Sequence, residues 1–158
     1  MREKAKDHRR LIFTKAKISR RLLIPFFSSY VHAGTFSPAT DHIEKVCDLN
    51  DLVIRNKDTT YFVRTIGDCM ADDGLWEGDI MIVDRSIEHY EGQIVVVWLD
   101  GEYIVRRYHN HQPDKLVVLM PANPYYEPIY VRPGDDFKMF GVVSFWLKKA
   151  QVKKIFDL

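Results

Sequence analysis

The sequence predicts a mainly β protein, a small curled β-barrel or sandwich with short helices and an extended N-terminal arm. Short β-branched segments separated by Gly and Pro turns are typical of this fold class. The dipeptide Asp100-Gly101 joins two of these segments, as in a β-hairpin. The chain has 158 residues, 46% of them hydrophobic, which is enough to fold around a core.

The first expected elements are short and helical. Residues 9–23 are compatible with a turn or two of basic helix. Asp41 is expected to cap a short helix through residues 42–47, and Asp48 a second one through residues 49–54. Cys47 would then lie in the first of these helices, in the core.

From residue 60 onward the pattern changes to β-strands. Residues 60–66 alternate between two faces, and residues 79–84 form an apolar run bounded by charge, as in a strand buried on both faces. Residues 93–108 contain two β-branched runs around Asp100-Gly101, a dipeptide that accommodates the positive φ angles of a type I′ turn. Further strands are expected at residues 115–120, 128–132 and 137–149.

Charge divides the chain near residue 33. Residues 1–33 contain nine Lys or Arg and two Asp or Glu, a net charge of +7, whereas residues 34–158 contain 14 and 20, a net charge of −6. A basic arm can fold back on an acidic body, make weak contact with nucleic acid, or remain solvated. We therefore expect a basic arm at residues 1–33 and a β-rich domain at residues 34–158, with turn-rich residues 34–41 at the boundary.

Composition excludes several classes of protein. The two cysteines are too few for a disulfide framework. No apolar run approaches the roughly 20 residues that span a bilayer, and the patch at residues 22–27 is too short, and interrupted by Pro25, to be a secretory signal. The His-Asn-His sequence at residues 109–111 offers too few ligands for a metal and is expected to be a solvated loop. We expect a cytoplasmic protein that binds no membrane, metal or cofactor.

Five blocks of sequence, in order and at matching spacings over about residues 22–149, resemble the UmuD proteins of the LexA/UmuD-like S24 autopeptidase family. The blocks are IPFFSSYVHAGTFSPATDHIEKVCDLNDLVIR, YFVRTIGDCMADDGLWEGDIMIVDRS, GQIVVVWLDGEYIVRRY, LMPANPYYEPI and FGVVSFWLKK. UmuD is a self-cleaving accessory subunit of a bacterial translesion DNA polymerase. The resemblance implies the LexA/UmuD-like C-terminal fold, a homodimer, and two partners: a UmuC-like Y-family polymerase and the RecA filament.

The same resemblance identifies candidate site residues. Cys69 stands where the family has its serine nucleophile, and Arg106 stands where it has a buried, neutral lysine that serves as general base. Ala33-Gly34 stands at the bond that the family cuts in its own arm. Because side chains alternate along a strand, only one of Arg106 and Arg107 can face a given site.

The two replacements have unequal chemical consequences. A thiol ionises more readily than a hydroxyl, so Cys69 could still serve as a nucleophile. A guanidinium keeps its proton, so Arg106 cannot act as a base, although it could stabilise a Cys69 thiolate. Loss of a general acid or base typically costs about 10²–10⁴-fold in rate. The sequence therefore predicts that self-cleavage at Ala33-Gly34 is impaired or lost.

Other interpretations remain open at this point. The protein could be an active, Cys-dependent autoprotease regulated by RecA, with His109, His111 or Lys115 replacing the base. Cys69 could also be a small buried residue with no chemical role, or an introduced replacement. A LexA-type repressor would need a helix-turn-helix domain ahead of Gly34, for which 33 residues are too few.

Overall fold

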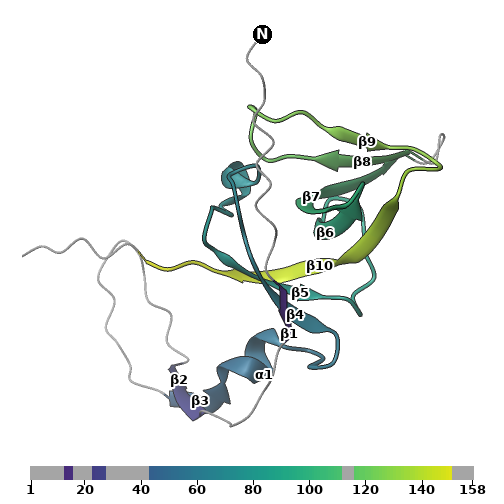
Figure 1. The fold of residues 1–158 in the computed structure, drawn as a ribbon. Coiled ribbons are helices and arrows are strands. Elements are labelled where there is room, and N and C mark those ends of the chain that lie inside the picture. Colours follow the sequence, from purple (N-terminus) through teal and green to yellow (C-terminus); the bar gives the residue numbers. More distant parts are fainter. Residues whose placement is uncertain (1–12, 16–22, 28–42, 112–115, 151–158) are drawn as a thin grey trace, which may run out of the picture.

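The structure is a computed structural model that describes residues 13–15, 23–27, 43–111 and 116–150. Its main feature is an eight-stranded sheet (Figure 1). In chain order the strands of this sheet are β1 (Phe13–Lys15), β4 (Thr60–Arg64), β5 (Ile80–Asp84), β6 (Ile94–Leu99), β7 (Glu102–His111), β8 (Leu116–Met120), β9 (Ile129–Val131) and β10 (Phe137–Leu147). Their spatial order is β1-β4-β5-β10-β6-β7-β8-β9, and every neighbouring pair is antiparallel. The predicted mainly β fold is confirmed.

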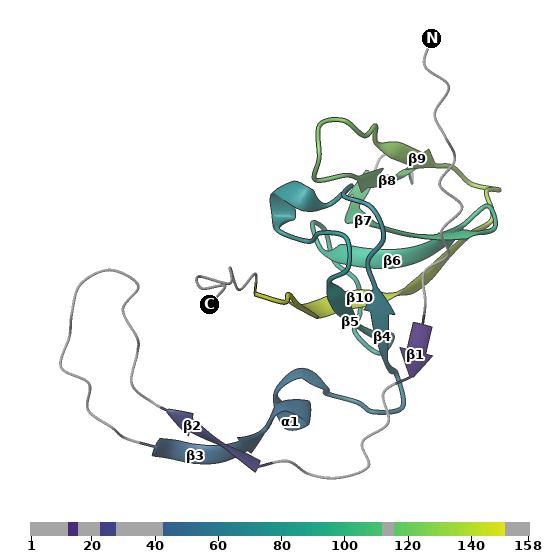
Figure 2. The same cartoon turned by 60° about the vertical axis from the view of Figure 1, so that its left-hand side comes forward.

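The remaining elements are short. Strands β2 (Leu23–Phe27) and β3 (Ile43–Asp48) form a separate two-stranded sheet away from the large one (Figure 2). Helix α1 (Leu49–Val53) follows β3, and its Val53 packs with Ile82 of β5 and Phe62 of β4. The 3₁₀ turn η1 (Ala71–Asp73) follows β4. Asp48 caps α1 as predicted, because its carboxylate accepts the backbone N–H of Asn50 at 2.9 Å.

Three local predictions are wrong. Residues 43–47 belong to β3 and not to a helix, since they pair with β2, and Cys47 on this strand is half-buried and outside the core. Residues 13–15 and 23 are also in strands, so the basic helix is wrong there, and the rest of residues 9–22, like Asp41, lies outside the described residues. His109 and Asn110 extend β7, which pairs with β8, so the solvated loop expected there is wrong.

Two local features bring the strands into register. Asp100 and Gly101 have φ angles of 48° and 93°, the positive values that a type I′ turn requires, so the predicted β6–β7 hairpin is confirmed. Strand β10 pairs with β6 through its first half and with β5 through its second, and its register shifts twice. A Cβ atom at Gly141, beside the first shift, would lie 2.9 Å from Val83 Cγ1, so the chain needs a glycine there.

Strand β6 is buried on both faces, and one of these faces packs against the segment that carries Cys69. Ile94 and Val96 pack into a hydrophobic cluster that also contains Cys69 and Met70. The alternate residues of β6, which include Val95, pack into a second cluster with residues of β7, β8, β9 and β10. The turn that carries Cys69 is therefore anchored in the first half of the core.

Candidate active site

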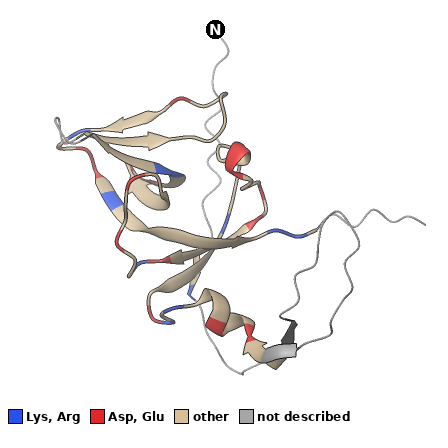
Figure 3. Ribbon diagram, turned by 180° about the vertical axis from the view of Figure 1, so that it is seen from behind, with Lys and Arg blue, Asp and Glu red and all other residues tan. Residues whose placement is uncertain are grey.

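The segment between β4 and β5 presents Cys69 to the hydrophobic core. Met70 and Leu75 form an isolated β-bridge around η1, whose Asp72 and Asp73 make it one of the acidic segments of the molecule (Figure 3). The chain beyond β8 holds this turn from the other side, because Ala122 N donates to the Cys69 carbonyl at 2.9 Å. Asp72 N in turn donates to the Ala122 carbonyl at 2.7 Å, so two segments distant in sequence fix the backbone at Cys69.

Arg106 on β7 contacts the Cys69 sulfur directly. Its Nη1 lies 2.7 Å from Cys69 Sγ and donates at 2.7 Å to the carbonyl of Val105, the preceding residue. The guanidinium therefore folds back along its own strand to reach the thiol. The thiol can donate to the same Val105 carbonyl, at 3.7 Å. These are the hydrogen-bond partners of Cys69 Sγ within the described part of the chain.

Burial decides the ionisation of this thiol. Only 8% of Cys69 is exposed, and the resulting desolvation raises the pKa of its thiol above the ordinary value of 9.0. The charge and the hydrogen bond of Arg106 lower the pKa, the charge of Asp68 raises it, and the net shift of the pKa is upward. The helical element that follows Cys69, η1, is a three-residue 3₁₀ turn, too short for its dipole to stabilise a thiolate much. At neutral pH the sulfur therefore carries its proton.

Tyr126, in the segment between β8 and β9, lies against Arg106. Its ring centroid is 5.8 Å from the guanidinium carbon, and its hydroxyl donates to Asp68 Oδ1 at 2.6 Å. This hydrogen bond, followed by burial, raises the pKa of Tyr126 to about 12, so the phenol stays protonated. Asn123 Nδ2 donates to the Asp68 carbonyl at 2.9 Å, which holds the residue before Cys69 in place.

Nothing in the sequence alone indicates a role for Tyr126 or Asn123, although both lie in the LMPANPYYEPI block. The available signal was an Asn-Pro turn followed by aromatic residues between two strands. That signal does not say which segment the turn contacts, because Asn123 and Asp68 are 55 positions apart.

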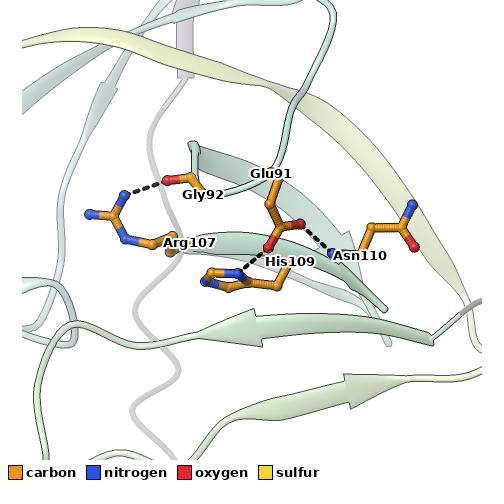
Figure 4. Close-up of polar contacts among 5 residues, drawn as sticks. All are labelled: Glu91, Gly92, Arg107, His109 and Asn110. Carbon is orange, nitrogen blue, oxygen red and sulfur yellow. Dashed lines mark hydrogen bonds and ion pairs between the residues drawn. The ribbon is translucent and has the colours of Figure 1, made fainter. Parts of the chain in front are cut away.

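The other candidate residues of β7 point to different partners. Arg107 forms an ion pair with Asp73 at 2.5 Å and donates to the Gly92 carbonyl (Figure 4). As alternation predicts, Arg106 rather than Arg107 contacts Cys69. His109 Nδ1 lies 2.5 Å from a carboxylate oxygen of Glu91, so its described contact is not with the thiol. Ala33, Gly34, Lys115 and the side chain of His111 lie outside the described residues.

Two kinds of feature are absent from the described ranges of the chain. No group of three or more His, Cys, Asp or Glu side chains in them is arranged to hold a metal ion. No helix in them is both long and apolar enough to cross a bilayer.

Comparison with known proteins places these features in a family. The sequence model of the Peptidase S24-like family matches residues 25–144. Protein SamA of Salmonella typhimurium is 39% identical over 127 residues, which are 80% of this chain and 86% of the relative. Protein ImpA of Escherichia coli is 33% identical over 76% of this chain and 80% of the relative, and protein MucA of Escherichia coli is 32% identical over 84% and 90%. The chain belongs to the Peptidase S24-like family.

Proposed function

We propose that this protein is a UmuD-like accessory subunit in SOS mutagenesis and translesion DNA synthesis, and that its self-cleavage at Ala33-Gly34 is impaired or lost. Membership of the S24-like family and the block-by-block resemblance to UmuD support the first part. The observation that carries the second part is the buried Cys69 thiol, whose pKa is raised by burial, 2.7 Å from the permanently charged Arg106.

Cleavage would need two proton transfers. The thiol must lose its proton before Sγ can attack the Ala33 carbonyl, and the departing Gly34 amine must receive one. Arg106 cannot accept a proton, and the Val105 carbonyl, the other partner of Cys69, is far too weak a base. We therefore assign Cys69 to the position of the nucleophile and Arg106 to the position of the general base, a role that a guanidinium cannot perform.

A set of matched variants tests this assignment. The purified full chain is incubated with and without a RecA–DNA filament, and its intact mass is followed over time. We expect the wild type to stay uncut, whereas Arg106→Lys, alone and with Cys69→Ser, should raise cleavage by about 10²-fold or more, because a lysine can lose its proton. Arg107→Lys is the matched control and should change nothing. Rapid loss of residues 1–33 from the wild type, abolished by Cys69→Ala, would contradict the proposal.

The second candidate is an active, Cys-dependent autoprotease of the same family, regulated by RecA. The specific observation in its favour is the 2.7 Å contact, since Arg106 would stabilise a Cys69 thiolate once it formed. The raised pKa of Cys69 means that the thiolate fraction grows only as pH rises past 9.0. This candidate therefore predicts cleavage that accelerates steeply in alkaline buffer and disappears in Cys69→Ala.

The accessory role also implies partners. We propose that the protein acts in the cytoplasm as a homodimer, through contacts with a UmuC-like Y-family polymerase and the RecA filament. Affinity purification from cells with damaged DNA should recover the polymerase, and the absence of any polymerase would count against the accessory role. The basic arm could add weak contact with nucleic acid, which a steep loss of binding with salt would reveal.

A further inference from the structure

A cavity of about 330 Å³ lies on the large sheet, where β6, β7 and β10 are neighbours (Figure 1). It is separate from the candidate active site, since neither Cys69 nor Arg106 lines it. Its lining combines two cations with apolar and aromatic side chains: Arg85, Lys138, Trp98, Tyr103, Met139 and Phe140. Ligand pockets typically measure about 300–1,000 Å³, so this cavity suits one or two side chains rather than a large cofactor.

Three aromatic rings line this cavity and contact one another. The ring of Tyr103 lies 4.9 Å from that of Trp98 and 5.4 Å from that of Phe140, centroid to centroid, at interplanar angles of 71° and 79°. Phe13 also contacts Tyr103 and Phe140, but it does not line the cavity. An aromatic side chain placed in the cavity would extend this cluster, and edge-to-face ring pairs stabilise association beyond the area that they bury.

Arg85 brings a positive charge to the cavity that no carboxylate neutralises within the described part of the chain. Its guanidinium carbon lies 5.3 Å from the centre of the Phe140 ring, and the residue is exposed. The ring orients the guanidinium by a cation–π contact and leaves its N–H groups available to a ligand. A guanidinium binds a carboxylate through two parallel hydrogen bonds, so Arg85 is suited to an acidic group.

Lys138, the second cation, is already paired. Its Nζ lies 3.2 Å from the carboxylate of Asp136, which also accepts the indole N–H of Trp98 at 3.0 Å. Lys138 is opposite Trp98 in the register of β10 with β6, whereas Arg85 directly follows β5. A ligand carboxylate therefore finds its partner in Arg85, and Asp136 disfavours further negative charge beside Lys138.

We infer that this cavity binds an acidic segment of a partner protein, with an aromatic side chain in the cavity and an adjacent carboxylate on Arg85. A single carboxylate interacts mainly with Arg85, because charges more than about 8–10 Å away are screened at physiological salt. A nucleic-acid strand fits less well, since it would bring several phosphates to a domain whose residues 34–158 carry a net charge of −6. This inference goes beyond the proposed function and does not depend on the chemistry of Cys69.

A peptide titration of the full chain, followed by NMR, tests the inference. The probe is the peptide GSDFEGS, and its controls are GSNFQGS, in which amides replace both carboxylates, and GSDAEGS, which lacks the ring. The indole N–H signal of Trp98, identified by its loss in Trp98→Phe, reports occupation of the cavity. We expect the probe to shift this signal and to bind about tenfold or more tightly than either control, because each control loses one of the two contacts.

Three protein variants locate the charge that the probe uses. Arg85→Gln should weaken the probe about tenfold or more, because a hydrogen-bonded ion pair is lost. Arg64→Gln is the matched control and should leave the affinity unchanged, since Arg64 lines a different cavity. Asp136→Asn keeps an acceptor for Trp98 but frees Lys138, and it should tighten the probe about two- to fivefold.

The outcomes separate the possible ligands. Equal affinity for the probe and GSNFQGS, or equal affinity of the wild type and Arg85→Gln, would overturn the inference. An oligothymidine strand that shifts the Trp98 signal at lower concentration than the probe would show a nucleic-acid ligand, which overturns the assigned partner. Because Arg85 is exposed, its replacement should leave the core intact. If Arg85→Gln does not fold, Arg85→Lys keeps the charge without the paired geometry and should still weaken the probe severalfold.

Discussion

Replacing Arg106 with glutamine measures what the guanidinium charge does to the Cys69 thiol. Opposite unit charges 2.7 Å apart attract by about 1.5 kcal/mol at the dielectric constant of water, and by more where water is partly excluded. That energy corresponds to a factor of about 10 in an ionisation constant. Because Arg106 lowers the pKa of Cys69, Arg106→Gln should raise it and reduce the thiolate fraction about tenfold or more at pH 8.

The assay is alkylation of Cys69 by iodoacetamide in a Cys47→Ser background, followed by mass spectrometry between pH 7 and 11. The midpoint of the rate against pH reports ionisation, whereas the plateau at high pH reports access to the buried sulfur. A substitution that merely opened the site would raise the plateau and leave the midpoint in place. The two effects can therefore be separated in one experiment.

Arg107→Gln is the matched control, because it removes the same charge from the next residue of β7. Arg107 contacts Asp73 and Gly92 rather than the thiol, so its loss should leave the midpoint unchanged. An Arg106→Gln midpoint equal to or below that of the wild type would refute the electrostatic account of the pair. The same result would remove the basis for assigning the contact any effect on cleavage.

Three further changes test other parts of the structure. Tyr126→Phe should weaken the pH dependence of the free energy of unfolding. The phenol has a pKa raised from 10.0 to about 12, so it stabilises the fold fully below pH 10 and loses this effect as the pH rises towards 12. Urea unfolding of both proteins at several pH values measures the difference. Gly141→Ala should destabilise by about 1–3 kcal/mol in urea unfolding, because its Cβ would lie 2.9 Å from Val83 Cγ1. Asp100→Val should cost about 1–2 kcal/mol at φ 48°, measured in the same way, whereas Asp100→Gly should be tolerated.

Local sequence was sufficient where neighbouring residues decide the conformation. The β6–β7 hairpin follows from Asp100-Gly101, since both residues must tolerate positive φ. The start of α1 follows from Asp48, whose carboxylate reaches a backbone N–H two residues away. The resemblance to UmuD likewise depended on ordered blocks of residues, and it led to the family that the comparisons show.

Local sequence did not predict the conformation of segments that pair with a strand distant in the sequence. Residues 43–47 are strand because they pair with β2, and His109 is in a strand because it pairs with Val118 of β8. A short segment carries too little local preference to resist such pairing, and its partner cannot be read from the segment itself.

The properties of the candidate site also fall into those that the sequence determines and those that depend on the tertiary structure. Residue identity alone determined that Arg106 cannot take up a proton and that Cys69 can lose one more readily than serine. Only the tertiary structure decided that the pKa of the thiol lies above its ordinary value despite the neighbouring Arg106, because desolvation depends on the side chains that fold around Cys69 from other segments. It also brought Tyr126 against Arg106 and Phe13 against Tyr103, contacts between residues too far apart in the chain for any sequence pattern to specify.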